Sequence, residues 1–313
     1  MQSKLYSRLL SGAAFLAIGT PALAQTAEDD ASWRQETIIV TGERTAYAAS
    51  SAASATRTNT PLIQVPQSVQ VITSTLLREQ DRRQLGDALV NVSGVTPTRT
   101  DENLFIPPIV RGFPAEVYLD GLPIFAGNQQ AYDPSSLTGV SRIDVLKGPT
   151  ATLYGGGLGT PLGGLINVVS ARPDETLGGH VALRTGSFST FNPYGEVNMP
   201  LAKGVSARIA AEYQSTDSWI DLVEGERWSI QPSLLFQFSP ETELLVQGQF
   251  NYRSSLEYSG IPAQQALAGT IDRDVFPGSP IGQPQTENEN RMVTLALRHA
   301  ISDQIDLNLT ARY

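Results

Sequence analysis

Apolar and polar residues alternate with a period of two through much of the chain after Gly178. In the segment 205–214 the apolar side chains occupy odd positions, as Ile209 does, and most polar ones occupy even positions, as Glu212 does. Successive side chains of a strand point to opposite faces, so this pattern predicts long strands with one apolar face. The same alternation marks residues 228–238, 244–253 and 305–313.

Two architectures are built from such strands, a soluble β-sandwich and a membrane β-barrel. The strands are about ten residues long, as bilayer-crossing strands must be. Short and long connections alternate, which favours the barrel with its tight turns at one rim and extended loops at the other. We therefore expect about seven strands of an antiparallel transmembrane β-barrel in residues 174–313. The short connections are Ala202–Gly204, Ser239–Glu241 and Ser302–Gln304, and the long ones are Ser215–Glu226 and Ser254–Asn290.

Residues 61–173 have a mixed character that predicts a separate α+β domain. Gln67–Thr73 alternates as a strand does, and Ser74 is a candidate N-cap for the helix that follows. A second short helix fits Gln84–Val90. Short strands separated by Gly and Pro turns complete a compact domain of about a hundred residues. These strands are predicted at Ile109–Phe113, Val117–Asp120 and Ser141–Leu146.

The N-terminus has the features of an export signal. Residues 1–24 combine Lys4 and Arg8 with a short apolar run and a small-residue cleavage pattern at Ala22–Ala24. Glu36–Gly42 then predicts a single β-branched strand. Residues 45–60 are dominated by Ala, Ser and Thr without an apolar period, so we expect a flexible linker. The strand therefore either pairs with the following domain or stays free for a partner.

Composition excludes several functional classes. The chain carries 22 Lys and Arg against 31 Asp and Glu, a net charge of -9, without a basic block, so nucleic acid is not an expected partner. It has no cysteine and only two histidines. No nucleophile and base, and no cluster of metal-ligand spacing, stand out in the sequence, so we expect neither an enzyme nor a resident metal or cofactor. No apolar segment reaches the length of a membrane-spanning helix.

A series of motifs between residues 61 and 169 resembles the plug domain of TonB-dependent siderophore receptors, in the order found in that family. The most specific of them is Arg142–Pro149, which continues to Leu153–Gly155. Glu36–Gly42 resembles the TonB box, which precedes the plug in these receptors. The other matching stretches are Pro61–Val69, Ile109–Phe113, Tyr118–Pro123 and Gly163–Val169.

The resemblance implies an outer-membrane receptor that lies in lipid, binds a ferric siderophore and imports it into the periplasm. TonB, energised by its inner-membrane complex, would pull on the box strand and remodel the plug. The backbone of that strand can add to a sheet edge of TonB, which is recognition largely independent of side chains. The siderophore would carry the iron, so the receptor itself needs no metal ligand. The residues expected to contact TonB are Glu36, Thr37, Ile38, Ile39, Val40 and Thr41.

The same resemblance suggests two groups of functional residues in the plug. Arg99 resembles in position an apical arginine that contacts siderophore, and a guanidinium suits an oxygen-rich anionic complex. Arg111, Asp144 and Lys147 are candidates for a structural latch, paired inside the plug or with charges of the barrel wall. A loop after the Tyr118–Pro123 stretch offers further ligand contacts, at Phe125, Gly127, Asn128, Gln129, Gln130 and Tyr132.

Several alternatives remain open at this point. The same architecture can import haem, cobalamin or a saccharide, because substrates change easily on one scaffold. A passive or adhesive barrel would need neither box nor plug, a periplasmic hydrolase would need a catalytic group that the sequence does not display, and a signalling receptor would need an additional periplasmic domain. About seven strands are fewer than the roughly 22 of plugged barrels. We therefore expect the chain to be the N-terminal part of such a receptor, or a truncated fragment without transport activity.

Overall fold

The computed structural model describes residues 47–52, 54, 57–58, 60–97, 108–124, 136–149, 162–258, 260–279, 282–302 and 304–313. All of them belong to the second of two compact units, Glu43–Tyr313. The predicted signal peptide and box strand lie outside the described residues. In the part of the chain that the structure describes, no helix is long and apolar enough to cross a bilayer.

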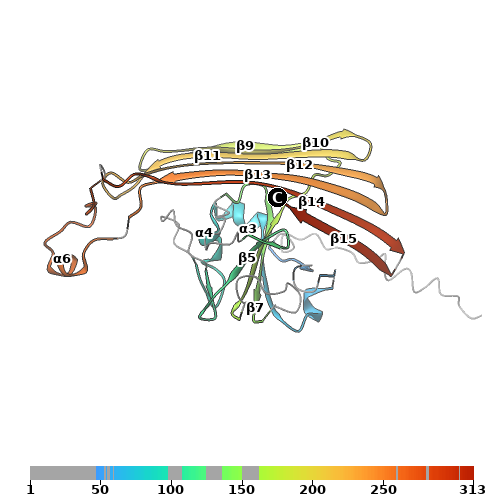
Figure 1. Ribbon diagram of the computed structural model, residues 1–313, viewed down its shortest axis with the longest axis horizontal. Coiled ribbons are helices and arrows are strands. Elements are labelled where there is room, and N and C mark those ends of the chain that lie inside the picture. The colour runs from blue at the N-terminus through green and yellow to red at the C-terminus, as the bar shows by residue number, and fades with distance from the viewer. Residues whose placement is uncertain are drawn as a thin grey trace, which may run out of the picture. The chain divides into compact units, whose positions relative to one another are not determined.

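The C-terminal half forms a seven-stranded antiparallel sheet, here called the wall, in which each strand pairs with the next along the chain (Figure 1). It confirms the predicted strands and their approximate number. Neighbouring strands of 13 to 17 residues occupy its centre, longer than the segments of visible alternation. The strands are β9 (Gly178–Gly186), β10 (Thr190–Ala202), β11 (Val205–Asp217), β12 (Glu224–Ser239), β13 (Thr242–Ser255), β14 (Thr286–Ser302) and β15 (Ile305–Arg312).

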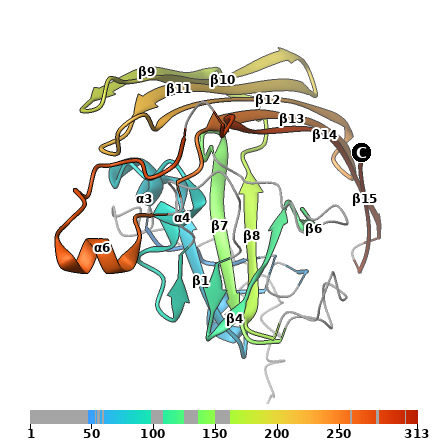
Figure 2. The ribbon, with the colours of Figure 1, turned by 60° about the vertical axis from the view of Figure 1, so that its left-hand side comes forward.

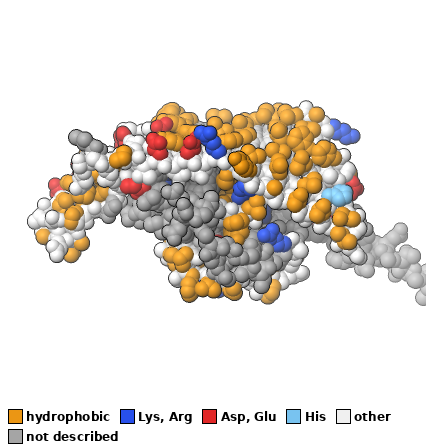
Figure 3. Space-filling model, in the orientation of Figure 1, with side chains coloured by type: hydrophobic (Ala, Val, Ile, Leu, Met, Phe, Trp, Pro, Cys, Tyr) orange, Lys and Arg blue, Asp and Glu red, His pale blue; other side chains and the backbone are white. Residues whose placement is uncertain are grey.

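The burial of the wall is the reverse of that of a soluble sheet. On β11 Ile209 is 41% exposed, whereas Ser206 and Glu212 are 3% and 4% exposed. Leu234 of β12 and Leu295 of β14 are likewise among the exposed large hydrophobic residues. Hydrophobic side chains therefore gather on the outer surface of the strands (Figure 3). A sandwich would bury its apolar face, so this arrangement is that of a barrel wall with an apolar face for lipid and a polar lumen.

The two rims of the wall differ. Two-residue turns connect β10 to β11 and β12 to β13, whereas residues 256–285 connect β13 to β14. The predicted connection Ser215–Glu226 is shorter in the structure, because β11 continues to Asp217 and β12 begins at Glu224. The long connection carries α6 (Ala263–Ala268), and its Leu256 and Phe276 form a small apolar cluster with Ile220 of the connection between β11 and β12. Pairing shifts by one residue at Pro200/Ala202, Gln237/Ser239 and Ala300/Ser302, all at the short-turn rim.

The N-terminal part forms a compact domain, here called the plug, around a five-stranded sheet of order β1-β7-β8-β5-β6. Only the β5–β8 pair is parallel within this sheet. Figure 2 shows β7 and β8 side by side at its centre. The elements are η2 (Leu62–Gln64), β1 (Ser68–Thr73), α3 (Ser74–Glu79), α4 (Leu85–Leu89), β5 (Glu116–Leu119), β6 (Leu122–Pro123), β7 (Val140–Lys147) and β8 (Gly164–Ser170), with a small sheet of β2 (Val95–Thr96), β3 (Ile109–Val110) and β4 (Phe113–Pro114).

The plug has a conventional apolar core. Leu89, Ile143 and Ile166, from α4, β7 and β8, have no measurable exposure and belong to one cluster. The central strands β7 and β8 are buried along most of their length, so both of their faces are covered. The α+β plug followed by antiparallel barrel strands is thus the predicted fold class.

Two local predictions for the plug were wrong. The N-cap of α3 is Thr73, whose hydroxyl accepts a hydrogen bond from the backbone N–H of Leu76, and not Ser74. Ser and Thr serve equally well in this role, so adjacent candidates cannot be separated by sequence. The predicted strand Ile109–Phe113 is divided into β3 and β4 by a tight turn. Arg111 and Gly112 adopt positive φ values of 50° and 86° in that turn.

Part of the segment predicted as a flexible linker is packed into the plug. Ala52 is fully buried and joins a cluster with Tyr118, Leu146 and Leu165. Ser54 is 6% exposed. Small side chains such as those of Ala52 and Ser54 can pack against a core that other residues form. They produce no hydrophobic periodicity, so their burial could not be predicted from the sequence.

Candidate functional site: the contact between plug and wall

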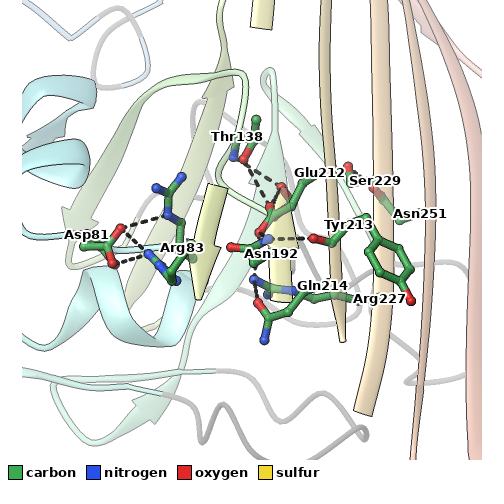
Figure 4. Close-up of polar contacts among 12 residues, drawn as sticks. Asp81, Arg83, Thr138, Asn192, Glu212, Tyr213, Gln214, Arg227, Ser229 and Asn251 are labelled. Atoms are coloured by element: carbon green, nitrogen blue, oxygen red, sulfur yellow. Dashed lines mark hydrogen bonds and ion pairs between the residues drawn. The ribbon is translucent and has the colours of Figure 1, made fainter. Parts of the chain in front are cut away.

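The carboxylate of Glu212 is the centre of a polar network that joins the wall to the plug (Figure 4). On the wall side, Oε1 accepts hydrogen bonds from Asn192 Nδ2 at 3.1 Å and from Arg227 Nη2 at 3.0 Å. On the plug side, Oε2 accepts from Thr138 Oγ1 at 3.1 Å and from the hydroxyl of Ser136. Four donors thus surround one buried carboxylate, two from each region.

The alternation of the wall strands places these side chains on one face. Glu212 is paired with Tyr194 of β10 and Ser229 of β12, so side chains from three strands converge at the same height. The network extends along the inner face, since Arg227 also donates to Gln214 Oε1 at 2.7 Å. Ser229 Oγ donates to Asn251 Oδ1 at 2.6 Å. The polar half of each strand is therefore used for cross-strand bonding and for holding the plug.

Burial makes this ion pair important for docking. The side chains of Arg227 and Glu212 are only 6% and 1% exposed. Removing one partner of a buried pair leaves an uncompensated charge and typically costs about 3–5 kcal/mol. The pair therefore fixes the carboxylate of Glu212 in the position in which it accepts hydrogen bonds from Ser136 and Thr138 of the plug.

Gly139 lies so close to the wall that no side chain fits there. A Cβ at this position would lie 2.7 Å from Ala210 Cβ and 2.9 Å from Gln231 Oε1, and the φ of Gly139 is +79°. Both the close contact and the backbone conformation require glycine. The start of β7 thus lies directly against β11 and β12.

Further polar contacts join the plug to both sides of the wall. Arg83 lies over the ring of Tyr194, with Cζ 3.5 Å from the ring centroid. Arg184 of β9 forms an ion pair with Asp81. At the other side, Arg312 Nη2 of β15 donates to the backbone oxygen of Leu119 at 2.7 Å. Polar side chains of the inner face thus reach the plug from β9 to β15.

Cavities remain between these contacts. One of about 180 Å³ lies at the rim with the longer connections and is lined by Gln84 of the plug and by Arg227, Arg253, Trp219 and Tyr258 of the wall, among others. Nearby, burial raises the pKa of Asp87, although the positive charges of Arg82 and Arg227 oppose this.

Two further cavities lie along the wall, one on each side of the plug. That of about 340 Å³ is lined by five arginines, Arg78, Arg82, Arg83, Arg172 and Arg208, and by a single carboxylate, Glu196. That of about 290 Å³ lies between the plug and β13–β15. The plug therefore contacts the wall at discrete points, with space between them. Among the described residues no group of three potential metal ligands is present.

The comparisons with known proteins agree with this architecture. Residues 61–160 match the family model described as the TonB-dependent receptor plug domain. The chain is 25% identical to the solved ferripyoverdine receptor of the outer membrane of Pseudomonas aeruginosa, with a TM-score of 0.68 over 81% of this chain and 34% of that one. A plug of this family is therefore docked on strands of the matching barrel. The chain belongs to the TonB-dependent receptors.

Two relatives with curated names extend the comparison. The chain is 29% identical to the metal-pseudopaline receptor CntO of Pseudomonas aeruginosa, over 95% of this chain and 42% of that receptor. It is 30% identical to the ferrioxamine receptor of Yersinia enterocolitica, over 74% of this chain and 33% of that receptor. The chain thus spans well under half the length of the relatives that it matches.

For this TonB-dependent receptor, the predicted ligand and TonB contacts fall outside the described residues. This applies to Arg99, to the loop residues from Phe125 to Tyr132 and to the box residues Glu36–Thr41. They stay predictions. Ser136, which donates a hydrogen bond to Glu212, lies four residues after Tyr132, the last residue of the predicted ligand loop.

The three predicted latch residues lie apart from the wall. Asp144 is fully buried and pairs inside the plug with Arg142 Nε at 3.0 Å. Lys147 Nζ donates to Ser93 Oγ at 2.9 Å, and burial, reinforced by the charge of Arg111, lowers the pKa of Lys147. Arg111 is exposed. Within the described residues, no hydrogen bond or ion pair joins these three side chains to the wall, and their role as a latch stays a prediction.

Glu212, which is bound by Arg227, makes a buried polar contact with the plug. The sequence contains a signal for Glu212, which is a charged residue on the polar face of a predicted strand, whereas Arg227 lies just before the next predicted strand. Their partners depend on strand register, however, and register follows from the turns rather than from the alternation.

Proposed function

We propose that the chain is part of an outer-membrane receptor that binds a ferric siderophore and imports it into the periplasm with energy delivered by TonB. The observation that carries the proposal is a plug held by buried polar contacts on the lumen face of a sheet whose outer face is apolar. Such a plug closes a barrel and must be moved before a ligand can pass. The names of the ferrioxamine and ferripyoverdine receptors support the class of ligand.

The docking contacts explain why the proposed transport requires energy. Displacing the start of β7 breaks the bonds of Ser136 and Thr138 to Glu212. Donors left unsatisfied at a buried site cost about 1–3 kcal/mol each. Thermal fluctuations rarely supply enough free energy to break several of these buried hydrogen bonds at once. The plug therefore stays in the closed position until force is applied. TonB would apply that force through the box strand Glu36–Thr41, by strand addition.

The ligand is proposed to bind at the rim with the longer connections. Arg99 and the loop from Phe125 to Tyr132 are the proposed plug contacts. The cavity next to Gln84 brings Arg227, Arg253 and two aromatic side chains to the same rim. Guanidinium and aromatic groups suit an oxygen-rich, anionic metal complex. The metal remains a part of the ligand, and the lipid of the outer membrane surrounds the apolar face of the wall.

A second candidate is import of a different metal–chelator complex. It is favoured by the similarity to a metal-pseudopaline receptor over nearly the whole of this chain. The two candidates share the plug, the wall and the energy source, and they differ only in the chelator and its metal.

Uptake by living cells tests both candidates. Cells expressing the complete reading frame that contains this chain, cells with that frame deleted and cells lacking TonB are supplied with radiolabelled iron as ferrioxamine B, ferrichrome or pyoverdine. We expect uptake of at least one complex that disappears in both deletion strains. Radiolabelled nickel and zinc with an opine-type chelator test the second candidate. Uptake restricted to haem or cobalamin, or uptake that persists without TonB, would overturn the proposal.

A further inference from the structure

The segment between the predicted box strand and the plug is attached to the plug core through Ser51, Ala52 and Ser54. Ser51 forms an antiparallel β-bridge with Pro61, and the backbone N–H of Leu62 donates to the carbonyl oxygen of Ser50 at 2.9 Å. Ala52 is fully buried next to the aromatic ring of Tyr118 and the side chains of Leu146 and Leu165. The segment therefore docks in a single place, fixed by backbone and by side chains.

Ser54 connects this segment to the two central strands. Its hydroxyl donates to Asp144 Oδ2 of β7 at 2.6 Å, and it accepts from Asn167 Nδ2 of β8 at 2.7 Å. Asp144 has no measurable exposure, and Asn167 is 3% exposed. Asn167 in turn accepts from the backbone N–H of Gly121 at 3.0 Å. One hydroxyl thus bridges the neighbouring strands β7 and β8 and, through Asn167, the turn after β5.

The position of Ser54 in the chain places these hydrogen bonds where tension from the N-terminus would act first. Only ten residues separate the end of the predicted box, Thr41, from Ala52. Tension applied to the box therefore reaches residues 51–54 before it reaches any strand of the five-stranded sheet. A fully extended segment of this length spans about 35 Å, so it cannot absorb a longer displacement.

We propose that Ser54 is the coupling residue of this receptor, and that withdrawal of residues 51–54 is the first step by which a pull on the N-terminus loosens the plug. The proposal rests on the proposed function, because it assumes that force enters through the box. Withdrawal removes a hydroxyl donor from a buried carboxylate and an acceptor from Asn167. It also removes Ala52 from the core at the junction of β5, β7 and β8.

The cavity beside Ser54 indicates where the plug opens. Ser54, Arg142 and Asn167 line the cavity of about 290 Å³, whose other side is formed by β13–β15 through residues such as Gln247 and Thr310. Withdrawal of the segment enlarges this space and exposes Asp144 to water. A polar passage then forms between the plug and this side of the wall, whereas the Glu212 contact is still closed.

A reversible cross-link tests the proposal. This chain contains no cysteine, so a Ser51→Cys/Pro61→Cys pair would have no other thiol of the chain with which to react. Residues facing each other in an antiparallel bridge have Cα atoms about 4.5–5.5 Å apart, within disulfide range, and the periplasm is oxidising. We expect ligand uptake to fall to the level of cells lacking TonB, to recover with reductant, and surface binding of the ligand to stay unchanged.

Matched controls separate the possible causes. The single variants Ser51→Cys and Pro61→Cys test the substitutions alone, and the Ser239→Cys/Thr242→Cys pair places a cross-link at a wall turn where Ser239 faces Thr242. All three should transport as the unmodified receptor does. Unimpaired uptake by the oxidised 51–61 pair would overturn the proposal. Absence of uptake by the unmodified receptor, with every ligand, would instead refute the proposed function.

A pulling experiment keeps the proposal testable if the cross-linked receptor is poorly expressed. The complete receptor, in bilayers, is extended from its N-terminus by force spectroscopy. Ser54→Ala should lower the force of the first extension event, because it deletes both hydrogen bonds of the hydroxyl. Thr58→Ala is the control, since Thr58 makes an exposed hydrogen bond to Thr60 and lies outside the bridge. Equal first forces for Ser54→Ala and the unmodified receptor would exclude Ser54 as the coupling residue.

Discussion

The plug and the wall use the same kinds of residue in opposite ways. In the plug, Ile143 and Ile166 are fully buried, whereas Ile209 and Ile230 of the wall are each 41% exposed. In the wall, buried positions belong instead to residues such as Ser229 and Asn251. The difference shows that alternation specifies a strand, and that the medium on each side decides which face turns inward.

The contact between the two regions follows from this difference. The inner face of the wall is polar, so it holds the plug through hydrogen bonds and ion pairs, with few apolar contacts such as that of Met292 with the plug core. Polar contacts of this kind are specific in geometry and can be remade after separation. A fully apolar interface would resemble a divided core and would favour permanent association.

The largest expected effect comes from breaking the buried ion pair. Glu212→Ala leaves Arg227 buried without its partner and should weaken docking of the plug by about 3–5 kcal/mol. Hydrogen exchange of the backbone amides of Thr138 and Val140, followed by mass spectrometry, measures the change. Glu212→Ala combined with Arg227→Met should restore only part of the protection, because no charge is then left uncompensated but Ser136 and Thr138 still lack their acceptor. Equal exchange in the single and double variants would show that the charge is not the cause.

The second test makes the same substitution in both regions. Ile143→Ala creates a cavity in the plug core and should reduce the stability of the plug by about 2–5 kcal/mol. Ile209→Ala should cost less, because lipid chains fill the space that the side chain leaves. Urea unfolding of the receptor in vesicles, with hydrogen exchange of β7 as the plug signal, compares the two. A larger effect at Ile209 would contradict the assignment of that face to lipid.

A third test adds a charge to either face of β15. Leu309→Arg places a guanidinium on the apolar face and should oppose membrane insertion by about 2–4 kcal/mol near the bilayer centre. Thr310→Arg, at the next residue, points into the cavity between plug and wall and should have little effect. The fraction of receptor that resists protease in vesicles gives the measurement. An equal loss of the protease-resistant fraction in both variants would contradict the assignment of one face of β15 to lipid and the other to the lumen.

The smallest expected effect concerns pH and is confined to the plug. Asp120 accepts hydrogen bonds from the backbone N–H and the hydroxyl of Ser170, at 2.8 and 2.7 Å, yet burial raises its pKa above the ordinary value of 3.8. The folded plug therefore binds this proton more tightly than the unfolded chain does. Its contribution favours folding as pH falls through the raised pKa and is lost as pH rises.

An Asp120→Asn variant isolates this contribution. The difference in plug stability between the variant and the unmodified receptor should change in that pH interval, and denaturation midpoints at a series of pH values measure it. Wall stability, followed through the tryptophans of β12 and the connection before it, should not change between the two proteins. A pH-independent difference in plug stability would contradict the raised pKa.

Sequence predicted the wall better than the plug contacts, for a physical reason. Alternation and turn residues are local, so the strands and the tight turn at Lys203–Gly204 followed from short segments. The approach of Gly139 to Ala210 joins residues far apart in the chain, and no local rule predicts it. The burial of Ala52 is similar, because alanine and serine are equally suited to a linker and to a closely packed surface.

The candidate site was predictable only in part. Glu212 was visible as a charged position on a polar face, but Arg227 lay outside the predicted strands, and their contact depends on the register of β11 and β12. Asp144 was expected to pair either inside the plug or with the barrel wall, and its partners Arg142 and Ser54 required the structure. The motifs of the family located the plug without revealing how it is held.

The one-residue shifts at the short-turn rim have a consequence for how the wall can change during evolution. Insertion of a single residue within β11 or β12 would exchange the lipid and lumen faces for the rest of the strand. At Pro200/Ala202, Gln237/Ser239 and Ala300/Ser302 the wall already absorbs such a residue as a bulge next to a turn. Odd-numbered insertions and deletions should therefore survive at this rim, while the membrane-crossing parts of the strands change length only in pairs of residues.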